Sequence, residues 1–185
     1  MRLPAHRRAW SRRVVVTVVA VAAVATATTA WALHGPASAL LGTSSETTCD
    51  DTSHETPADA ASRISGLTAG TRAALARAQH DAGRAGVTLT VNSGYRSAAY
   101  QKRIYDCWVA ELGSPQAARQ RALPPGESAH VAGYALDIAP QQAADWLEKS
   151  AGAYGLCRRY ENEAWHFEYQ ASYAKRGCPA LLAHP

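Results

Sequence analysis

Acidic residues are missing from the first 39 positions of the chain, which contain five arginines. A basic excess is missing from the rest, where 14 basic residues stand against 15 acidic ones. The net charge of +4 and the pI near 9.0 therefore come from the N-terminal segment. Nucleic-acid binding depends on Lys and Arg side chains that neutralise phosphates, so we do not expect the rest of the chain to bind nucleic acid.

Charge of either sign is also missing from residues 14–33, a run of twenty residues that follows Arg12 and Arg13. An uncharged run of this length is long enough to span a bilayer. Ala37, Ser38 and Ala39 fit a signal-peptidase site, so the segment is either a cleaved signal or a retained anchor. We expect residues 1–39 to be this N-terminal element and the functional domain to work outside the cytoplasm.

Paired CxxC spacing is absent from the four cysteines, which argues against a zinc site built from cysteine. An even number of cysteines in an exported chain indicates two disulfides instead. Three pairings are possible. We favour Cys157–Cys178, which would brace the segment that carries His166, and Cys49–Cys107, which would attach the N-terminal tail to the domain.

Internal repeats are absent as well, and 185 residues allow one domain of ordinary size. Residues 40–60 are polar and predict a linker, which leaves 61–185 as the domain. Helical spacing and capping residues, with Thr68 as one N-cap, predict helices over 67–86, 98–112 and 141–155 and a short helix at Ser114-Pro115. Strands are expected within 87–97, 134–139 and 164–169. Because helices and strands do not alternate regularly, the pattern predicts an α+β fold.

Few polar groups interrupt the apolar runs, and three of them suit a metal site. His130 and Asp137 lie in "SAHVAGYALDI", and His166 lies in "ENEAWHFEY". Two histidines and one carboxylate are typical of a catalytic zinc, which has three protein ligands and an open position for water. Spacing alone leaves ordinary structural roles open for each of them, such as a packed histidine or an Asp that caps a turn.

Hydrolysis also needs a base, and Glu163 lies three residues before His166. An odd spacing on an ideal strand puts two side chains on opposite faces, so the backbone must turn there or Glu163 must precede the strand. Glu161 is the competing candidate. Arg96 in "SGYRS" would supply a cation for a negatively charged oxygen, with Gly94 allowing that loop to turn sharply.

Taken together and in this order, "SGYRS", "SAHVAGYALDI" and "EAWHFEY" resemble the VanY-like D-alanyl-D-alanine carboxypeptidases, zinc peptidases that trim the peptide stems of bacterial cell walls. The resemblance covers about residues 65–170 and implies a small antiparallel sheet flanked by helices, the hedgehog/DD-peptidase fold. It implies one zinc ion bound by His130, Asp137 and His166. It also implies roles for other side chains: Glu163 rather than Glu161 as general base and acid, Arg96 at the scissile carbonyl, Gln101 and Ser128 near the terminal carboxylate of the substrate, and Trp165 as a packing residue that fixes His166.

The resemblance implies a zinc D,D-carboxypeptidase that removes the terminal D-Ala from peptidoglycan stem peptides. From the N-terminal segment we expect it to be exported and tethered to the membrane, and we expect a monomer. An L,D-carboxypeptidase or a peptidoglycan endopeptidase with the same zinc site is an alternative. A non-catalytic, zinc-bearing wall-binding module and a membrane-anchored interaction domain without metal are two others. Glu163 and Arg96 argue against the wall-binding module, because a structural zinc site needs neither and usually closes with a fourth protein ligand.

Overall fold

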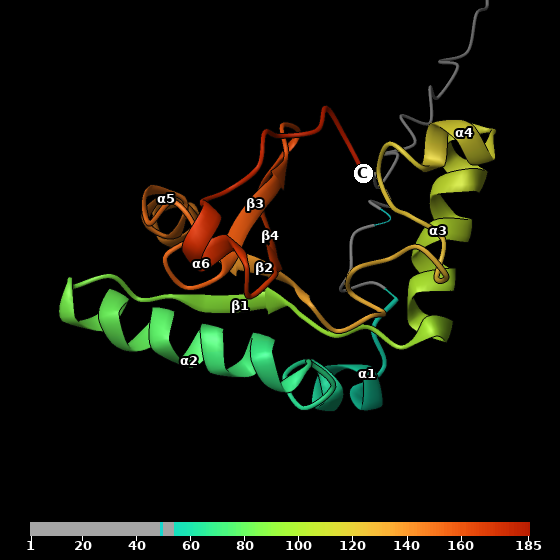
Figure 1. The fold of residues 1–185 in the computed structure, drawn as a ribbon. Helices are drawn as coiled ribbons and strands as arrows, with labels where there is room; N and C mark the ends of the chain where they lie inside the picture. The colour runs from blue at the N-terminus through green and yellow to red at the C-terminus, as the bar shows by residue number, and fades with distance from the viewer. Residues whose placement is uncertain (1–48, 50–53) are drawn as a thin grey trace, which may run out of the picture. The chain divides into compact units, whose positions relative to one another are not determined.

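The protein contains one small sheet with helices packed around it (Figure 1). The structure, a computed structural model, describes residues 49 and 54–185, which belong to one structural unit, 44–185. The elements are, in order, α1 (Pro57–Ser62), α2 (Ala69–Arg84), β1 (Thr90–Ser93), α3 (Ala98–Leu112), α4 (Pro115–Ala118), β2 (Ala135–Ala139), α5 (Gln141–Lys149), β3 (Leu156–Tyr160), β4 (Glu163–Tyr169) and α6 (Tyr173–Arg176). All neighbouring strands are antiparallel, in the order β1-β2-β4-β3. The predicted α+β class and small antiparallel sheet are therefore confirmed.

The predicted signal or anchor, residues 1–39, lies outside the described residues. Within the part of the chain that is described, no helix combines the length and the apolar character needed to cross a membrane.

The two faces of the sheet differ because side chains alternate along each strand. Leu136 and Ile138 of β2 and Phe167 of β4 are buried in the main core. Their partners are mostly alanine and leucine side chains of the two helices on that face: Ala74, Leu75, Ala78 and Ala82 of α2, and Ala143, Ala144 and Leu147 of α5. Asp137, between the two core residues of β2, points to the opposite face.

The predicted helix starts rest on local hydrogen bonds. Thr68, Ser97 and Ser114 each accept a hydrogen bond from the backbone N–H three residues later, at 3.1 Å. These bonds satisfy N–H groups that have no partner within the first turn. Thr68 is thereby confirmed as the N-cap of α2.

Four elements of the structure differ from the sequence prediction. The strand expected within 87–97 is only Thr90–Ser93. Helix α5 ends at Lys149, because the turns that follow it place Gly152 and Gly155 at positive φ. Strand β3 was not predicted, since "LCRRY" shows no alternation of apolar and polar residues. Helix α1 starts inside the segment taken as a linker, with Thr56 and Asp59 forming a capping box.

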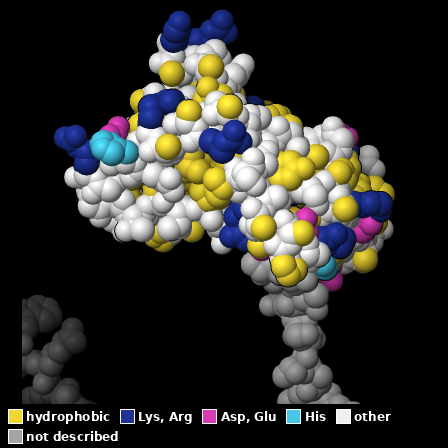
Figure 2. Space-filling view, turned by 90° about the horizontal axis from the view of Figure 1, so that it is seen from below, with side chains coloured by type: hydrophobic (Ala, Val, Ile, Leu, Met, Phe, Trp, Pro, Cys, Tyr) yellow, Lys and Arg dark blue, Asp and Glu magenta, His cyan; other side chains and the backbone are white. Residues whose placement is uncertain are grey.

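Both favoured disulfides are present. Cys157–Cys178 joins β3 to the segment after α6, and Cys49–Cys107 joins residue 49 to α3. No described cysteine is free. On the face that Figure 2 shows, Lys and Arg side chains are scattered and do not merge into one basic surface.

Candidate metal and catalytic site

Two of the three predicted ligands come from neighbouring strands. Asp137 of β2 pairs directly with His166 of β4, and side chains of directly opposed residues point to the same face of the sheet. His166 Nδ1 lies 3.1 Å from Asp137 Oδ1. Strand pairing therefore brings together two residues that are 29 positions apart in the sequence.

The third predicted ligand, His130, lies on the loop before β2 and is fixed by backbone groups. Its Nδ1 donates to the carbonyl oxygen of Gly94 at 2.7 Å. Its own carbonyl accepts from the N–H groups of Arg96 and Gly133, at 3.3 and 3.1 Å. With Nδ1 used in this way, Nε2 faces Asp137 Oδ2 at 3.5 Å.

Gly94 and Gly133 allow the chain segments around His130 to approach one another. A Cβ atom on Gly94 would lie 2.4 Å from the carbonyl oxygen of Arg63. Gly94 is not at positive φ, so its role is this close approach and not the sharp turn expected from the sequence. Gly133 has φ of 77°, and a Cβ there would lie 2.8 Å from the carbonyl oxygen of Gly66.

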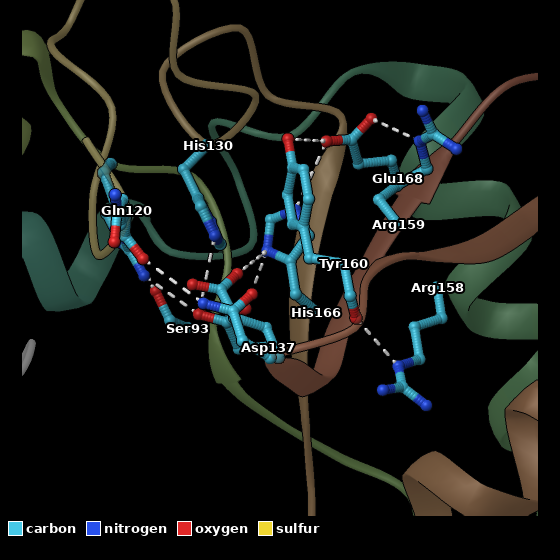
Figure 3. A network of polar contacts seen from close by, with 12 residues as sticks. Ser93, Gln120, His130, Asp137, Arg158, Arg159, Tyr160, His166 and Glu168 are labelled. Carbon is cyan, nitrogen blue, oxygen red and sulfur yellow. Dashed lines mark hydrogen bonds and ion pairs between the residues drawn. The ribbon is translucent and has the colours of Figure 1, made fainter. Parts of the chain in front are cut away.

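The donor atoms of His130, Asp137 and His166 form one cluster (Figure 3). One ligand atom from each residue lies within 4.8 Å of the others, and each residue is only 5% exposed. Two imidazole nitrogens and one carboxylate oxygen match the donor set of a catalytic zinc site. These residues therefore fit the metal that the sequence predicts.

The charges at the cluster suit metal binding. Burial raises the pKa of Asp137, but the two histidines and Arg96 lower it more, so this pKa lies well below the usual range. Burial and the Arg96 guanidinium lower the pKa of His130. The Asp137 carboxylate is thus ionised and the His130 ring neutral near pH 7, the forms in which these groups bind metals.

His166 is supported by acidic and aromatic neighbours that the sequence analysis missed. Its Nε2 lies 3.3 Å from Glu168 Oε1, and Glu168 also accepts from Tyr160 Oη at 3.4 Å and pairs with Arg159 at 3.6 Å (Figure 3). Burial opposes protonation of His166, but Asp137 and Glu168 raise its pKa to about 9. A metal ion at this site must therefore displace a proton from His166. The i, i+2 spacing of His166 and Glu168 could have predicted this contact, because it puts both side chains on the same face of a strand.

Arg96 reaches the cluster from the loop between β1 and α3. Its Nε donates to Ser93 Oγ at 2.9 Å, its Nη1 to Gln101 Oε1 at 3.2 Å and its Nη2 to Asp137 Oδ2 at 2.9 Å. An irregularity in the pairing of β1 with β2 places Ser93 opposite Asp137. The guanidinium is buried and held in a fixed orientation beside Asp137, the predicted metal ligand.

Glu163 lies in β4 and still reaches His166, despite the odd spacing. Arg158 of β3 pairs with Phe167, but Tyr160 pairs with Glu163, so the register shifts between them. The irregularity re-aims the strand, as β-bulges do. Glu163 Oε2 lies 3.8 Å from His166 Nδ1. Glu161 is exposed and does not line the cavity at the cluster.

A cavity of about 680 Å³ opens onto the cluster. The predicted site residues that line it are Arg96, Gln101, Ser128, His130, Asp137, Glu163 and His166. The Gln101 side chain bonds to Arg96 and donates from Nε2 to the carbonyl oxygen of Leu123 at 2.7 Å. Trp165 also lines the cavity but is 45% exposed, so it is not the packed residue expected from the sequence.

Comparison with known proteins supports the family that the motifs resemble. The family model of VanY, D-alanyl-D-alanine carboxypeptidase, matches residues 65–178. The chain belongs to the VanY family. Among curated relatives, a D-alanyl-D-alanine carboxypeptidase of Enterococcus faecalis is 35% identical over 115 residues, 48% of this chain and 43% of the relative. The chain thus spans less than half the length of this relative.

Solved structures of VanY proteins share the fold. VanYB in complex with D-alanine-D-alanine matches with a TM-score of 0.54 and 28% identity, over 60% of this chain and 75% of that one. A vancomycin-resistance D,D-pentapeptidase VanY, in complex with Zn(II), matches with a TM-score of 0.53 and 27% identity, over 60% and 76%. The LdcB LD-carboxypeptidase matches with a TM-score of 0.50 and 29% identity, over 56% and 58%.

Proposed function

We propose that this protein is a zinc-dependent D,D-carboxypeptidase that removes the terminal D-Ala from peptidoglycan stem peptides. One observation carries the proposal: the three-ligand cluster and the Glu163 carboxylate line the same cavity. Among the described residues, no fourth His, Cys, Asp or Glu joins this cluster, as suits a catalytic rather than a structural zinc site. The solved VanY structure with Zn(II) and the one with D-alanine-D-alanine support the choice of metal and of substrate class.

The proposed roles follow from the contacts of each side chain. Zinc held by His130 Nε2, Asp137 and His166 Nδ1 would supply Lewis-acid chemistry at the scissile carbonyl and the attacking water. Glu163 takes a proton from that water and returns it to the leaving amine. Arg96, held by Ser93 and Gln101, stabilises the negative charge that develops on the carbonyl oxygen. Gln101 and Ser128 would lie near the terminal carboxylate of the substrate.

The test is an assay with a stem pentapeptide that ends in D-Ala-D-Ala, with and without a zinc chelator. We expect release of one D-Ala, detected by mass spectrometry, and its loss with the chelator. Release from a tetrapeptide instead would favour the L,D-carboxypeptidase, the activity named for LdcB. Cleavage inside a cross-linked stem would favour an endopeptidase, and zinc binding without any cleavage would favour the wall-binding module.

Glu163→Gln provides a second test, with Glu161→Gln as its matched control. Glu163→Gln should retain zinc and lower kcat by about 100-fold or more, since general acid–base catalysis contributes about that much. Glu161→Gln should keep the wild-type rate, because Glu161 does not line the cavity. The reverse result would transfer the role of the base to Glu161.

We also propose that the protein is exported through residues 1–39, as a monomer, with residues 40–60, of which 57–60 belong to α1, leading into the domain 61–185. Two disulfides support an oxidising compartment outside the cytoplasm. The mass of the mature protein after expression in a bacterium will distinguish a cleaved signal from a retained anchor, and sedimentation will give its oligomeric state.

A further inference from the structure

A second arginine, Arg121, lines the same cavity as the metal-ligand cluster. Its guanidinium lies over the ring of Trp108 in α3, with Cζ 5.5 Å from the ring centroid. Trp108 also lines the cavity and packs against Tyr100, Ile104 and Ala122. Stacking on a fixed aromatic ring restrains the guanidinium while leaving its in-plane N–H groups able to donate hydrogen bonds.

Among the described residues, the basic side chains that line this cavity are Arg96 and Arg121. The two arginines differ in their partners. Arg96 donates to Ser93, Gln101 and Asp137. Arg121, by contrast, forms no ion pair with any described carboxylate, whereas Arg119, two residues earlier, pairs with Glu127. Arg121 is exposed, so the cavity contains a solvent-accessible cation that is not held in an ion pair by a described side-chain carboxylate.

Gln101 connects the Arg121 segment to the catalytic side of the cavity. Its amide accepts from Arg96 and donates to the carbonyl oxygen of Leu123, two residues after Arg121. Gln101 is 2% exposed, so this connection is shielded from water. The backbone next to Arg121 is therefore connected, through Gln101, to Arg96, which contacts Asp137.

We propose that Arg121, stacked on Trp108, binds a carboxylate of the peptide substrate. The proposal rests on the proposed function, in which the substrate has a free carboxylate one residue after the scissile bond. An acidic side chain elsewhere in the peptide offers the same chemistry. An arginine fork binds a carboxylate through two parallel hydrogen bonds, so Arg121 would orient the peptide as well as attract it.

The test uses three pentapeptides that end in D-Ala-D-Ala. The first has both its terminal and its side-chain carboxylates free, the second has a terminal carboxamide, and the third has amidated side chains. KM and kcat are measured for wild type, Arg121→Met, Arg121→Lys and Arg119→Met. Arg119→Met is the matched control, because it removes a positive charge from the same segment but not from the cavity.

Arg121→Met should raise KM for the first peptide by about tenfold, with a smaller change in kcat, because one charged hydrogen-bonded pair is lost. Arg121→Lys should recover part of this loss. If wild type and Arg121→Met have the same KM for one of the amidated peptides, the carboxylate that is blocked in that peptide is the one that Arg121 binds. An equal effect of Arg121→Met on all three peptides, or the same effect from Arg119→Met, would overturn the proposal.

Binding measured without turnover separates this proposal from the proposed function. Calorimetry with zinc-loaded Glu163→Gln, with and without Arg121→Met, gives the preference for free over amidated carboxylate directly. If wild type cleaves no peptide but this preference depends on Arg121, the subsite stands and the proposed reaction fails. If wild type cleaves but the preference does not depend on Arg121, the reaction stands and the subsite fails. If no peptide binds at all, both fail.

Discussion

The strand half of the site, Asp137 and His166, is held differently from the loop half, Arg96 and His130. Direct pairing of β2 with β4 sets the first pair, and a side chain, Glu168, supports His166 from behind. The second pair is joined through main-chain groups: the Arg96 N–H donates to the His130 carbonyl, and the Gly94 carbonyl accepts from His130. Removal of the Glu168 side chain should therefore perturb the strand half, and displacement of the backbone at Gly94 the loop half.

The largest expected effect is the loss of zinc on removal of a proposed ligand, and one such substitution in each half compares the two halves directly. Asp137→Ala and His130→Ala should each abolish zinc retention, since each removes one of three ligands. Asp137→Ala should also lower the free energy of unfolding by about 3 kcal/mol, because it removes the buried carboxylate that pairs with the Arg96 guanidinium. Elemental analysis and urea unfolding measure both quantities. Full zinc content in either variant would exclude that residue as a ligand.

A methyl group at Gly94 disturbs the loop half alone. Gly94→Ala should destabilise the protein by about 2–4 kcal/mol, within the range of the largest single-residue effects, because the new Cβ would lie 2.4 Å from the Arg63 carbonyl oxygen. It should also weaken zinc binding through displacement of His130.

The control for this variant is Gly83→Ala in α2, where a Cβ meets nothing within 4 Å. That substitution should stabilise the protein by about 0.5–1 kcal/mol, because alanine is the better helix former. Equal unfolding midpoints for the two variants would show that close approach at Gly94 is unimportant.

Glu168 offers a smaller perturbation of the strand half. Glu168→Ala should weaken zinc binding by about tenfold or more, the effect usual for a residue that supports a ligating histidine. Glu168→Gln keeps an acceptor without the charge, so its zinc affinity should lie between those of wild type and Glu168→Ala. Competition with a chromophoric chelator gives the three constants. Unchanged affinity in both variants would leave Glu168 as a partner of Tyr160 and Arg159 only.

The smallest expected effect on stability comes from Asp59 of α1, which supports the loop half. Asp59 accepts hydrogen bonds from Ser97, Thr56 and Arg103 at 2.7, 2.8 and 2.6 Å. Burial raises the pKa of Asp59, but these bonds lower it more, so it is lower in the folded state than in the unfolded one. The ionised Asp59 carboxylate therefore stabilises the folded state at neutral pH, and this contribution is lost as the pH falls through the folded-state pKa of Asp59.

Asp59→Asn should accordingly cost about 1–2 kcal/mol of unfolding free energy at pH 7 and less at pH values below about 4. Urea unfolding at pH 7 and pH 3 measures this difference. A cost that stays constant between the two pH values would mean that the charge of Asp59 contributes nothing.

Local patterns in the sequence predicted much of the fold. Thr68 and Ser114-Pro115 mark helix starts because capping depends on residues within one turn. A strand was expected within 134–139, and β2 lies there at Ala135–Ala139. Strand β3 was not predictable in this way, because "LCRRY" becomes a strand through pairing with β4, which lies after it in the sequence.

For the site, the sequence by itself determined which chemical groups are available: His130, Asp137, His166, Glu163 and Arg96 lie in motifs with a recognisable order. Only the tertiary structure decided how they meet. The register of β2 with β4, the irregularity that turns Glu163 toward His166 and the approach of Gly94 to Arg63 all depend on contacts between distant segments. Side-chain alternation and helix capping are local properties of the chain. Strand register and the placement of Arg121 on Trp108, by contrast, arise from packing between segments that are separated in the sequence.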